Sequence, residues 1–379
     1  MFPEYGGVRM DRRGFLKVGG AGLAGAVLLG PAVAVGGRAA ARTKPSLDQL
    51  FDAAAERYGV PEELLKAMGY VNTMWEMPPP DATPYEPEDL HGRGDYGLMQ
   101  LTENPAEDTL GRAADLTGLS EGEIKGKRAA NVRAGAAVLS DLAGSKKPLD
   151  LNGWYEIVAE YGDGPLYANE VYTALQNGAS RTISTGERVE LSPQPEAETQ
   201  AIPEPRIKAD YGRARWFGNN GKNFSRRDRG SKIIDKIVIH VAQGTYSGTL
   251  DWFRHPKCQS SAHYTVAKKG AIGQSVREDD IAWHAGWWET NQHSIGIEHA
   301  GYIGNPAWFT RKMYHASARL TAYISKRYGV PLDRRHVISH AQVPGCSGPG
   351  GGISCHVDPG RHWNWERYMR LARRYKRRR

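Results

Sequence analysis

The chain has 379 residues, of which 40% are hydrophobic, and a formal net charge of +8. This apolar content is enough for two folded cores and excludes a disordered chain. With a mean hydropathy of −0.56, no stretch after residue 41 approaches the length of a membrane span. Basic residues gather at 213–229 and 370–379, a pattern also found in nucleic-acid-binding proteins. The run DRRGFLK at 11–17 is typical of exported chains, which argues against a nucleic-acid partner.

The first 41 residues are predicted to be a signal peptide of the twin-arginine class. The run DRRGFLK at 11–17 precedes a weakly apolar segment rich in glycine and alanine that reaches residue 37. Cleavage is expected after Ala34 or Ala41, and the sequence does not choose between them. An uncleaved anchor is the alternative, although the glycines and Pro31 make a poor spanning helix. We therefore expect a secreted, wall-associated protein with no stable membrane span after cleavage.

Residues 45–180 are predicted to form a helical domain. Apolar residues recur at helical spacing in 47–58 and 62–75, and 129–142 is rich in alanine. The region resembles the lysozyme-like lytic transglycosylases, through YGVPEELLKA at 58–67, GDYGLMQL at 94–101 and AEYGDG at 159–164. The resemblance implies an all-α, lysozyme-like fold for this N-terminal domain.

The catalytic Glu-Ser pair of that family falls on Asn72 and Thr73 in this sequence. An amide cannot protonate a glycosidic oxygen, which requires a carboxylic acid. The domain is therefore predicted to bind glycan without cutting it. Glu76, one helical turn further on, is the alternative acid.

Residues 181–210 are rich in Pro, Glu, Gln and Ser with few large apolar side chains, which predicts an extended linker. Residues 211–379 are then predicted to form a second domain of α/β class. We expect a mixed β-sheet flanked by helices such as 310–328, followed by the basic C-terminal tail.

Three short segments of the second domain each deliver a residue that binds metals. The apolar runs IVIH and VISH end at His240 and His340, and CHVDPG places Asp358 in a tight turn. Neutral imidazole and carboxylate are ligands that Zn²⁺ accepts, and three protein ligands leave a fourth position for a reactive water. We predict that these three residues bind zinc, with a cysteine thiol in place of Asp358 as the alternative.

The second domain resembles the zinc-dependent N-acetylmuramoyl-L-alanine amidases of the phage-lysozyme and peptidoglycan-recognition type over about 233–368. The motifs are IVIH at 237–240, SAHY at 261–264 followed by Lys269-Gly270, AWHAG at 282–286, SIGIE at 294–298, VISH at 337–340 and HVDPG at 356–360. The resemblance implies that Glu298 is the catalytic acidic residue and that the substrate is the amide between N-acetylmuramic acid and L-alanine. His356 stands where many relatives carry a lysine.

Amide hydrolysis gives the other candidate residues their roles. Glu298, at the end of an apolar strand pattern, can move a proton from the attacking water to the leaving nitrogen. His356 can hydrogen-bond the developing oxyanion. Trp283 and His284 belong to an aromatic cluster predicted to contact the substrate. Cys346 and Cys355 bracket a glycine-rich loop and are predicted to form a disulfide.

The sequence as a whole predicts a secreted zinc amidase that acts on peptidoglycan. Two alternatives stay open: a peptidoglycan-recognition protein without activity, and a bifunctional enzyme that is also a lytic transglycosylase. The basic tail could engage anionic wall polymers by screened attraction, or could simply be solvated.

Overall fold

The computed structural model describes residues 44–379, apart from 86–91, 163, 228, 345–355 and 378–379. The predicted signal peptide and the predicted pair Cys346 and Cys355 lie outside these described residues. Within them, residues 45–379 form one compact unit. No helix in the described part of the chain is long and apolar enough to cross a bilayer.

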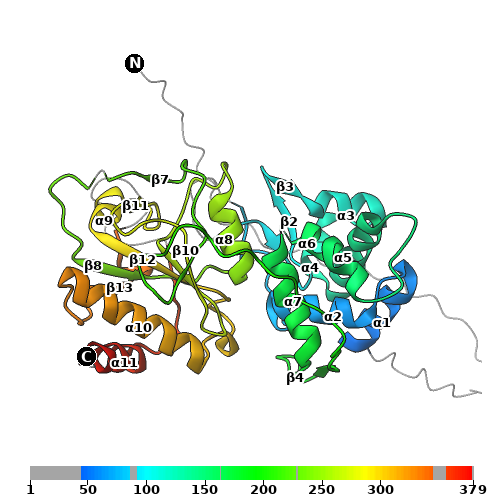
Figure 1. The fold of residues 1–379 in the computed structure, drawn as a ribbon. Coiled ribbons are helices and arrows are strands. Elements are labelled where there is room, and N and C mark those ends of the chain that lie inside the picture. The colour runs from blue at the N-terminus through cyan, green and yellow to red at the C-terminus, as the bar shows by residue number, and fades with distance from the viewer. Residues whose placement is uncertain (1–43, 86–91, 163, 228, 345–355, 378–379) are drawn as a thin grey trace, which may run out of the picture. The chain divides into compact units, whose positions relative to one another are not determined.

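Packed helices make up most of residues 45–180 (Figure 1). They are α1 (Leu47–Tyr58), α2 (Glu62–Thr73), α3 (Thr109–Thr117), α4 (Glu121–Gly126), α5 (Arg128–Ala143), α6 (Tyr155–Tyr161) and α7 (Pro165–Asn177). Capping boxes at Ser46 and Ser120 start α1 and α4, because each side chain accepts a hydrogen bond from a backbone N–H of the first turn.

Short strands interrupt this helical region. β1 (Asp95–Tyr96), β2 (Leu101–Asn104) and β3 (Glu107–Asp108) form an antiparallel sheet. The all-α prediction therefore missed a small sheet, because two-residue strands carry no readable periodicity.

The segment predicted to be a linker contains regular structure. β4 (Ala179–Thr182) and β5 (Arg188–Leu191) pair as an antiparallel hairpin. The side chains of Ile183, Val189 and Ala197 are buried in the same apolar cluster as the helices. This part of 181–210 thus packs on the helical region, while the domain boundaries stay predictions.

A six-stranded mixed sheet forms the centre of residues 211–379, which confirms the predicted α/β class for this region. Its spatial order is β13 (Val337–Ser339), β8 (Lys236–Ile239), β12 (Ser294–His299), β9 (Tyr264–Val266), β10 (Ile272–Gln274) and β6 (Arg215–Trp216). All neighbouring pairs are parallel except β9 with β10. A second, two-stranded sheet joins β7 (Phe224–Ser225) to β11 (Ile281–Ala282).

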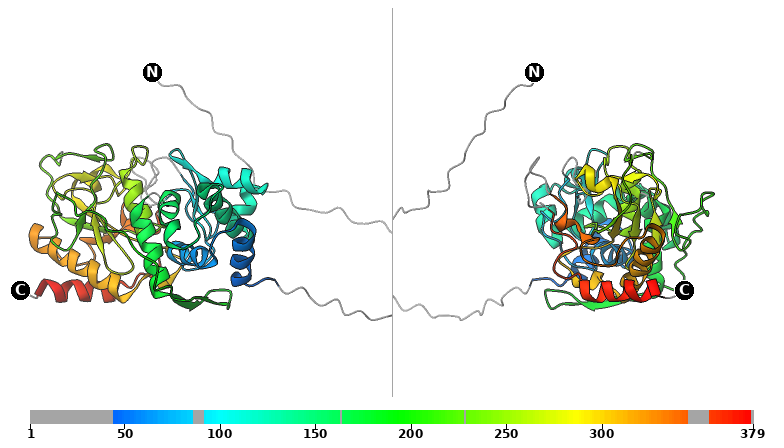
Figure 2. Two further views of the ribbon diagram at one scale, coloured as in Figure 1. Left: turned by 45° about the vertical axis from the view of Figure 1, so that its right-hand side comes forward. Right: turned by 90° about the vertical axis from the view of Figure 1, so that its left-hand side faces the viewer.

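Two long helices pack on one face of the large sheet. α10 (Arg311–Tyr328) and α11 (Trp365–Arg377) lie side by side beneath it in Figure 1, and Figure 2 shows them together again. Ile237, Ile239, Ile295 and Ile297 share one buried cluster with both helices. Because side chains alternate along a strand, the intervening positions face the opposite side. That side carries α8 (Tyr246–Arg254) and α9 (Trp288–Gln292).

The register of the parallel strands brings three of their ends level. Ile239 of β8 pairs with Ile297 of β12 and with Ser339 of β13. The next residues along the chain, His240, Glu298 and His340, therefore meet at the carboxyl edge of the sheet. Ligand sites of open α/β sheets commonly lie at such an edge.

Candidate metal centre and active site

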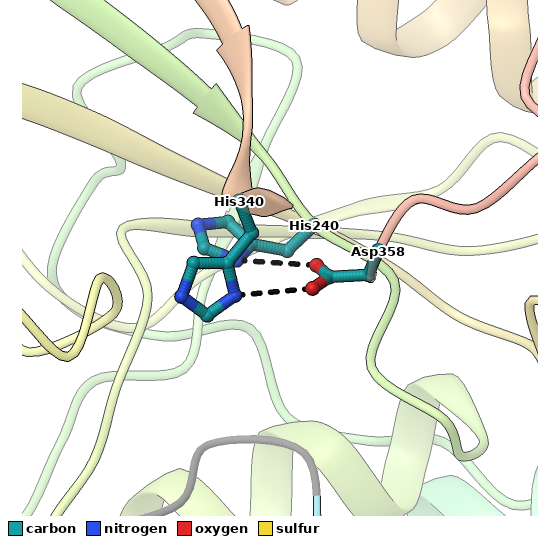
Figure 3. Close-up of side chains that lie close together, drawn as sticks. All are labelled: His240, His340 and Asp358. Carbon is teal, nitrogen blue, oxygen red and sulfur yellow. Dashed lines mark hydrogen bonds and ion pairs between the residues drawn. The ribbon is translucent and has the colours of Figure 1, made fainter. Parts of the chain in front are cut away.

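His240, His340 and Asp358 converge in a buried cluster (Figure 3). The Nδ1 atom of His340 lies 3.1 Å from Asp358 Oδ1, and the Nδ1 atom of His240 lies 3.5 Å from Asp358 Oδ2. The backbone N–H of Val241 also donates to Asp358 Oδ2 at 3.3 Å. The turn that carries Asp358 thus holds the carboxylate against the ends of β8 and β13.

The donor set of this cluster fits a zinc ion. Each of the three residues offers one ligand atom, and these atoms lie within 4.8 Å of one another. Two imidazole nitrogens and one carboxylate oxygen are a ligand set known from catalytic zinc sites with an open fourth position. The residues predicted from the sequence are therefore those that the fold brings together.

Glu298 lies on the next strand, beside the cluster. Its Oε1 atom is 4.0 Å from His240 Nδ1, and the residue is 1% exposed. A cavity beside Glu298 is lined also by Gln243, Gly244 and Thr245, from the loop that follows β8. The carboxylate is therefore close enough to the candidate metal position to exchange a proton with a water bound there.

Two comparisons of sequence bear on this arrangement. The family described as N-acetylmuramoyl-L-alanine amidase matches residues 229–361. N-acetylmuramoyl-L-alanine amidase A of Achromobacter lyticus is 34% identical over 172 residues, which are 43% of this chain and 94% of that protein. The chain belongs to the N-acetylmuramoyl-L-alanine amidase family. The prediction of such an enzyme is confirmed.

A second sequence relative is also an amidase by name. The 1,6-anhydro-N-acetylmuramyl-L-alanine amidase AmpD of Haemophilus influenzae is 30% identical over 136 residues, 33% of this chain and 68% of that protein. Among solved structures, a selenomethionyl AmpD derivative aligns with a TM-score of 0.32 and 24% identity, over 44% of this chain and 97% of that chain. The family assignment rests on the two sequence relatives.

His356 of the amidase lies at the edge of the candidate metal centre. Its ring stacks on that of His340, with centroids 3.7 Å apart and planes inclined by 15°. The residue is partly buried. This position is compatible with a hydrogen bond to a substrate oxygen.

The two residues predicted to contact the substrate, Trp283 and His284, differ in their exposure to solvent. Trp283 is partly exposed, and its Nε1–H donates to Ser225 Oγ at 3.1 Å. His284 is fully buried, with one ring nitrogen 3.1 Å from His240 Nε2 and the other 3.0 Å from Ser294 Oγ. Burial, and then the neighbouring histidines, hold the pKa of His284 well below its ordinary value. His284 therefore contacts His240, a candidate metal ligand, and is not on an exposed surface.

Three further histidines of the amidase belong to its scaffold. His263 Nδ1 accepts from the backbone N–H of Gly296, and burial holds its pKa well below the ordinary value. His299 is hydrogen-bonded to the carbonyl of His240 and to Ser317, and burial lowers its pKa to about 4. His293 Nδ1 lies 3.3 Å from Asp235.

Sequence reasoning assigned no role to two residues that support the candidate ligands. Asn291 Oδ1 accepts the backbone N–H groups of His284 and Ala285, and Ser294 contacts the His284 ring. Both residues are polar and fully or nearly fully buried. The available signals were positions only: Asn291 lies between the AWHAG motif and β12, and Ser294 is the first residue of the SIGIE motif, but neither position by itself assigns a role.

In the helical region, Asn72 is held by internal hydrogen bonds. Its Nδ2 donates to the Leu98 carbonyl at 3.2 Å, and Tyr167 donates to its Oδ1 at 2.9 Å. The alternative acid, Glu76, accepts hydrogen bonds from Arg181 and from Ser184. Both side chains are therefore occupied in tying the region together.

Proposed function

We propose that the chain is a zinc-dependent peptidoglycan amidase that cleaves the bond between N-acetylmuramic acid and L-alanine of the stem peptide. The observation that carries the proposal is the convergence of two histidines and one aspartate beside a buried glutamate at one sheet edge. The names of the two relatives support this substrate bond.

The residues of the site divide the work of amide hydrolysis. His240, His340 and Asp358 would hold Zn²⁺, which when bound lowers the pKa of a water to about 7 and polarises the substrate carbonyl. Glu298 takes a proton from the attacking water and delivers it to the departing nitrogen of L-alanine. His356 donates a hydrogen bond to the carbonyl oxygen as negative charge develops there.

The proposed place of action is the cell wall outside the membrane. The twin-arginine pattern before residue 41 supports export of the chain. α11 presents Arg370, Arg373, Arg374 and Arg377 to solvent, and this basic face supports a contact with anionic wall polymers.

Digestion of purified peptidoglycan tests the activity and the metal together. We expect the mature chain to free L-alanine amino groups, chelator treatment to stop the release, and added Zn²⁺ to restore it. Glu298→Gln should keep one bound zinc and lose about 100-fold or more of the rate, because the amide cannot carry the proton. Glu366→Gln is the matched control, since this carboxylate lies on the surface of α11, where 89% of the side chain is exposed.

The outcome also separates the alternatives. Peptidoglycan binding without any freed amino groups would indicate a recognition protein and contradict the proposal. Release that persists after the metal is removed, or a Glu298→Gln variant as active as the control, would reject the proposed chemistry.

A further inference from the structure

A chain of hydrogen bonds leads from α9 to the ligand His240. Ser294 Oγ lies 2.5 Å from the carbonyl oxygen of Thr290, and 3.0 Å from His284 Nε2. His284 Nδ1 lies 3.1 Å from His240 Nε2. The three side chains that these hydrogen bonds join, Ser294, His284 and His240, are fully buried.

The single hydroxyl proton of Ser294 decides the direction of every bond. A carbonyl has no proton to give, so the Ser294 hydroxyl donates to Thr290 and its oxygen can only accept from His284 Nε2–H. A neutral His284 then has no proton on Nδ1, which accepts from His240 Nε2–H. The other nitrogen of His240, Nδ1, is left without a proton and faces Asp358 at 3.5 Å.

The backbone around His284 fits this role. Asn291 Oδ1 fixes the N–H groups of His284 and Ala285 at 3.1 and 2.9 Å. The imidazole lies against Gly296 of β12, where an added Cβ would come within 2.4 Å of the His284 Cγ atom. The ring therefore has little freedom to move away from His240.

We infer that His284 and Ser294 are positioning residues, which hold His240 in the Nε2–H tautomer with Nδ1 aimed at the metal position. Neither touches the substrate or the metal; they act through His240. Metal-binding histidines commonly need such a partner on the second nitrogen, and its loss weakens metal affinity by about 10–100-fold. The inference rests on the proposed zinc site.

The test measures zinc affinity and needs no turnover. The mature chain is stripped of metal, and its dissociation constant for Zn²⁺ is measured by competition with a chromophoric chelator. We expect Ser294→Ala and His284→Leu to raise that constant about 10–100-fold. His284→Asn should recover most of the affinity, because its side-chain oxygen occupies nearly the place of Nδ1 and can accept from His240.

Ser325→Ala is the matched control. Ser325 is also a buried serine whose hydroxyl donates to a backbone carbonyl at 2.5 Å, that of Val330, but it lies on α10 beneath the opposite face of the sheet. This variant should lose stability and keep the zinc affinity of the wild type. Two-bond ¹H–¹⁵N spectra of the imidazoles should in addition show His284 as a single Nε2–H tautomer in the wild type and a mixture in Ser294→Ala.

The results distinguish the two proposals. A wild-type chain that binds no zinc would overturn the zinc site and this inference with it. A wild-type chain that binds zinc while folded Ser294→Ala and His284→Leu bind equally well would overturn this inference alone. Equal losses of affinity in His284→Asn and His284→Leu would also overturn it, because the acceptor would then be irrelevant.

Discussion

Buried histidines crowd the carboxyl edge of the sheet, and their ring contacts set different roles for them. His240 and His340 direct Nδ1 toward Asp358, whereas His299 bonds a carbonyl and a serine. All three are fully buried, so burial alone does not separate ligand from scaffold. The identity of the atom opposite each ring nitrogen decides the role.

Cys258 gives a prediction about a single thiol. It is 3% exposed, and burial raises the pKa of its thiol to about 12. A raised pKa means less thiolate, so little of the reactive form is present at pH 8. We expect negligible alkylation of Cys258 by iodoacetamide in the folded chain and rapid alkylation in urea, each measured by peptide mapping. Rapid labelling of the folded chain at pH 8 would contradict the buried position.

At the scale of elements, local signals define where the supporting helices begin and end. Thr310 caps α10 by accepting the backbone N–H of Met313 at 3.1 Å, and Gly329 ends the helix with φ of 75°. Both features are readable in the sequence, because threonine before a helix and glycine after it are common caps. The predicted helix 310–328 agrees with α10 and its N-cap residue.

Gly329→Ala tests the cap of α10. An added Cβ meets no atom within 4 Å, so the cost comes from the left-handed backbone alone and should be roughly 1 kcal/mol of unfolding free energy. Gly304→Ala is the control, since its site is equally open and its backbone is not left-handed. Denaturant unfolding measures both variants. Equal stability changes in the two would show that the cap geometry does not matter.

At the scale of the whole molecule, the helical region and the sheet region each have an apolar cluster of their own, and their polar residues differ. The helical region buries one cluster together with the β4–β5 hairpin, and the large sheet buries another with α10 and α11. The candidate metal ligands and Glu298 all come from the sheet region. In the helical region, Asn72 stands at the position where the resemblance to lytic transglycosylases implies a catalytic glutamate.

The products of wall digestion test this division. We expect new L-alanine amino groups and no new reducing or anhydromuramyl sugar ends, because the Asn72 amide cannot act as a general acid. Asn72→Ala should lower stability, since the Leu98 carbonyl and the Tyr167 hydroxyl lose buried partners, and should leave the product pattern unchanged. Mass spectrometry of the released fragments measures both kinds of end, and anhydromuramyl ends would show that the helical region is active.

The sequence alone determined the features that depend on neighbouring residues along the chain: the apolar runs that end at His240 and His340, the turn at Asp358, and the helix at 310–328. It also indicated the family, because the motifs and their order are properties of the sequence itself. Tertiary structure decided which residues of different segments contact one another. Ser294, only ten residues from His284, reaches its ring because α9 and β12 fold the two together, and the β4–β5 hairpin packs where composition predicted a linker. The physical reason is that composition and spacing describe one segment at a time, whereas a hydrogen-bond partner or a buried neighbour is fixed only when strand register brings separate segments into contact.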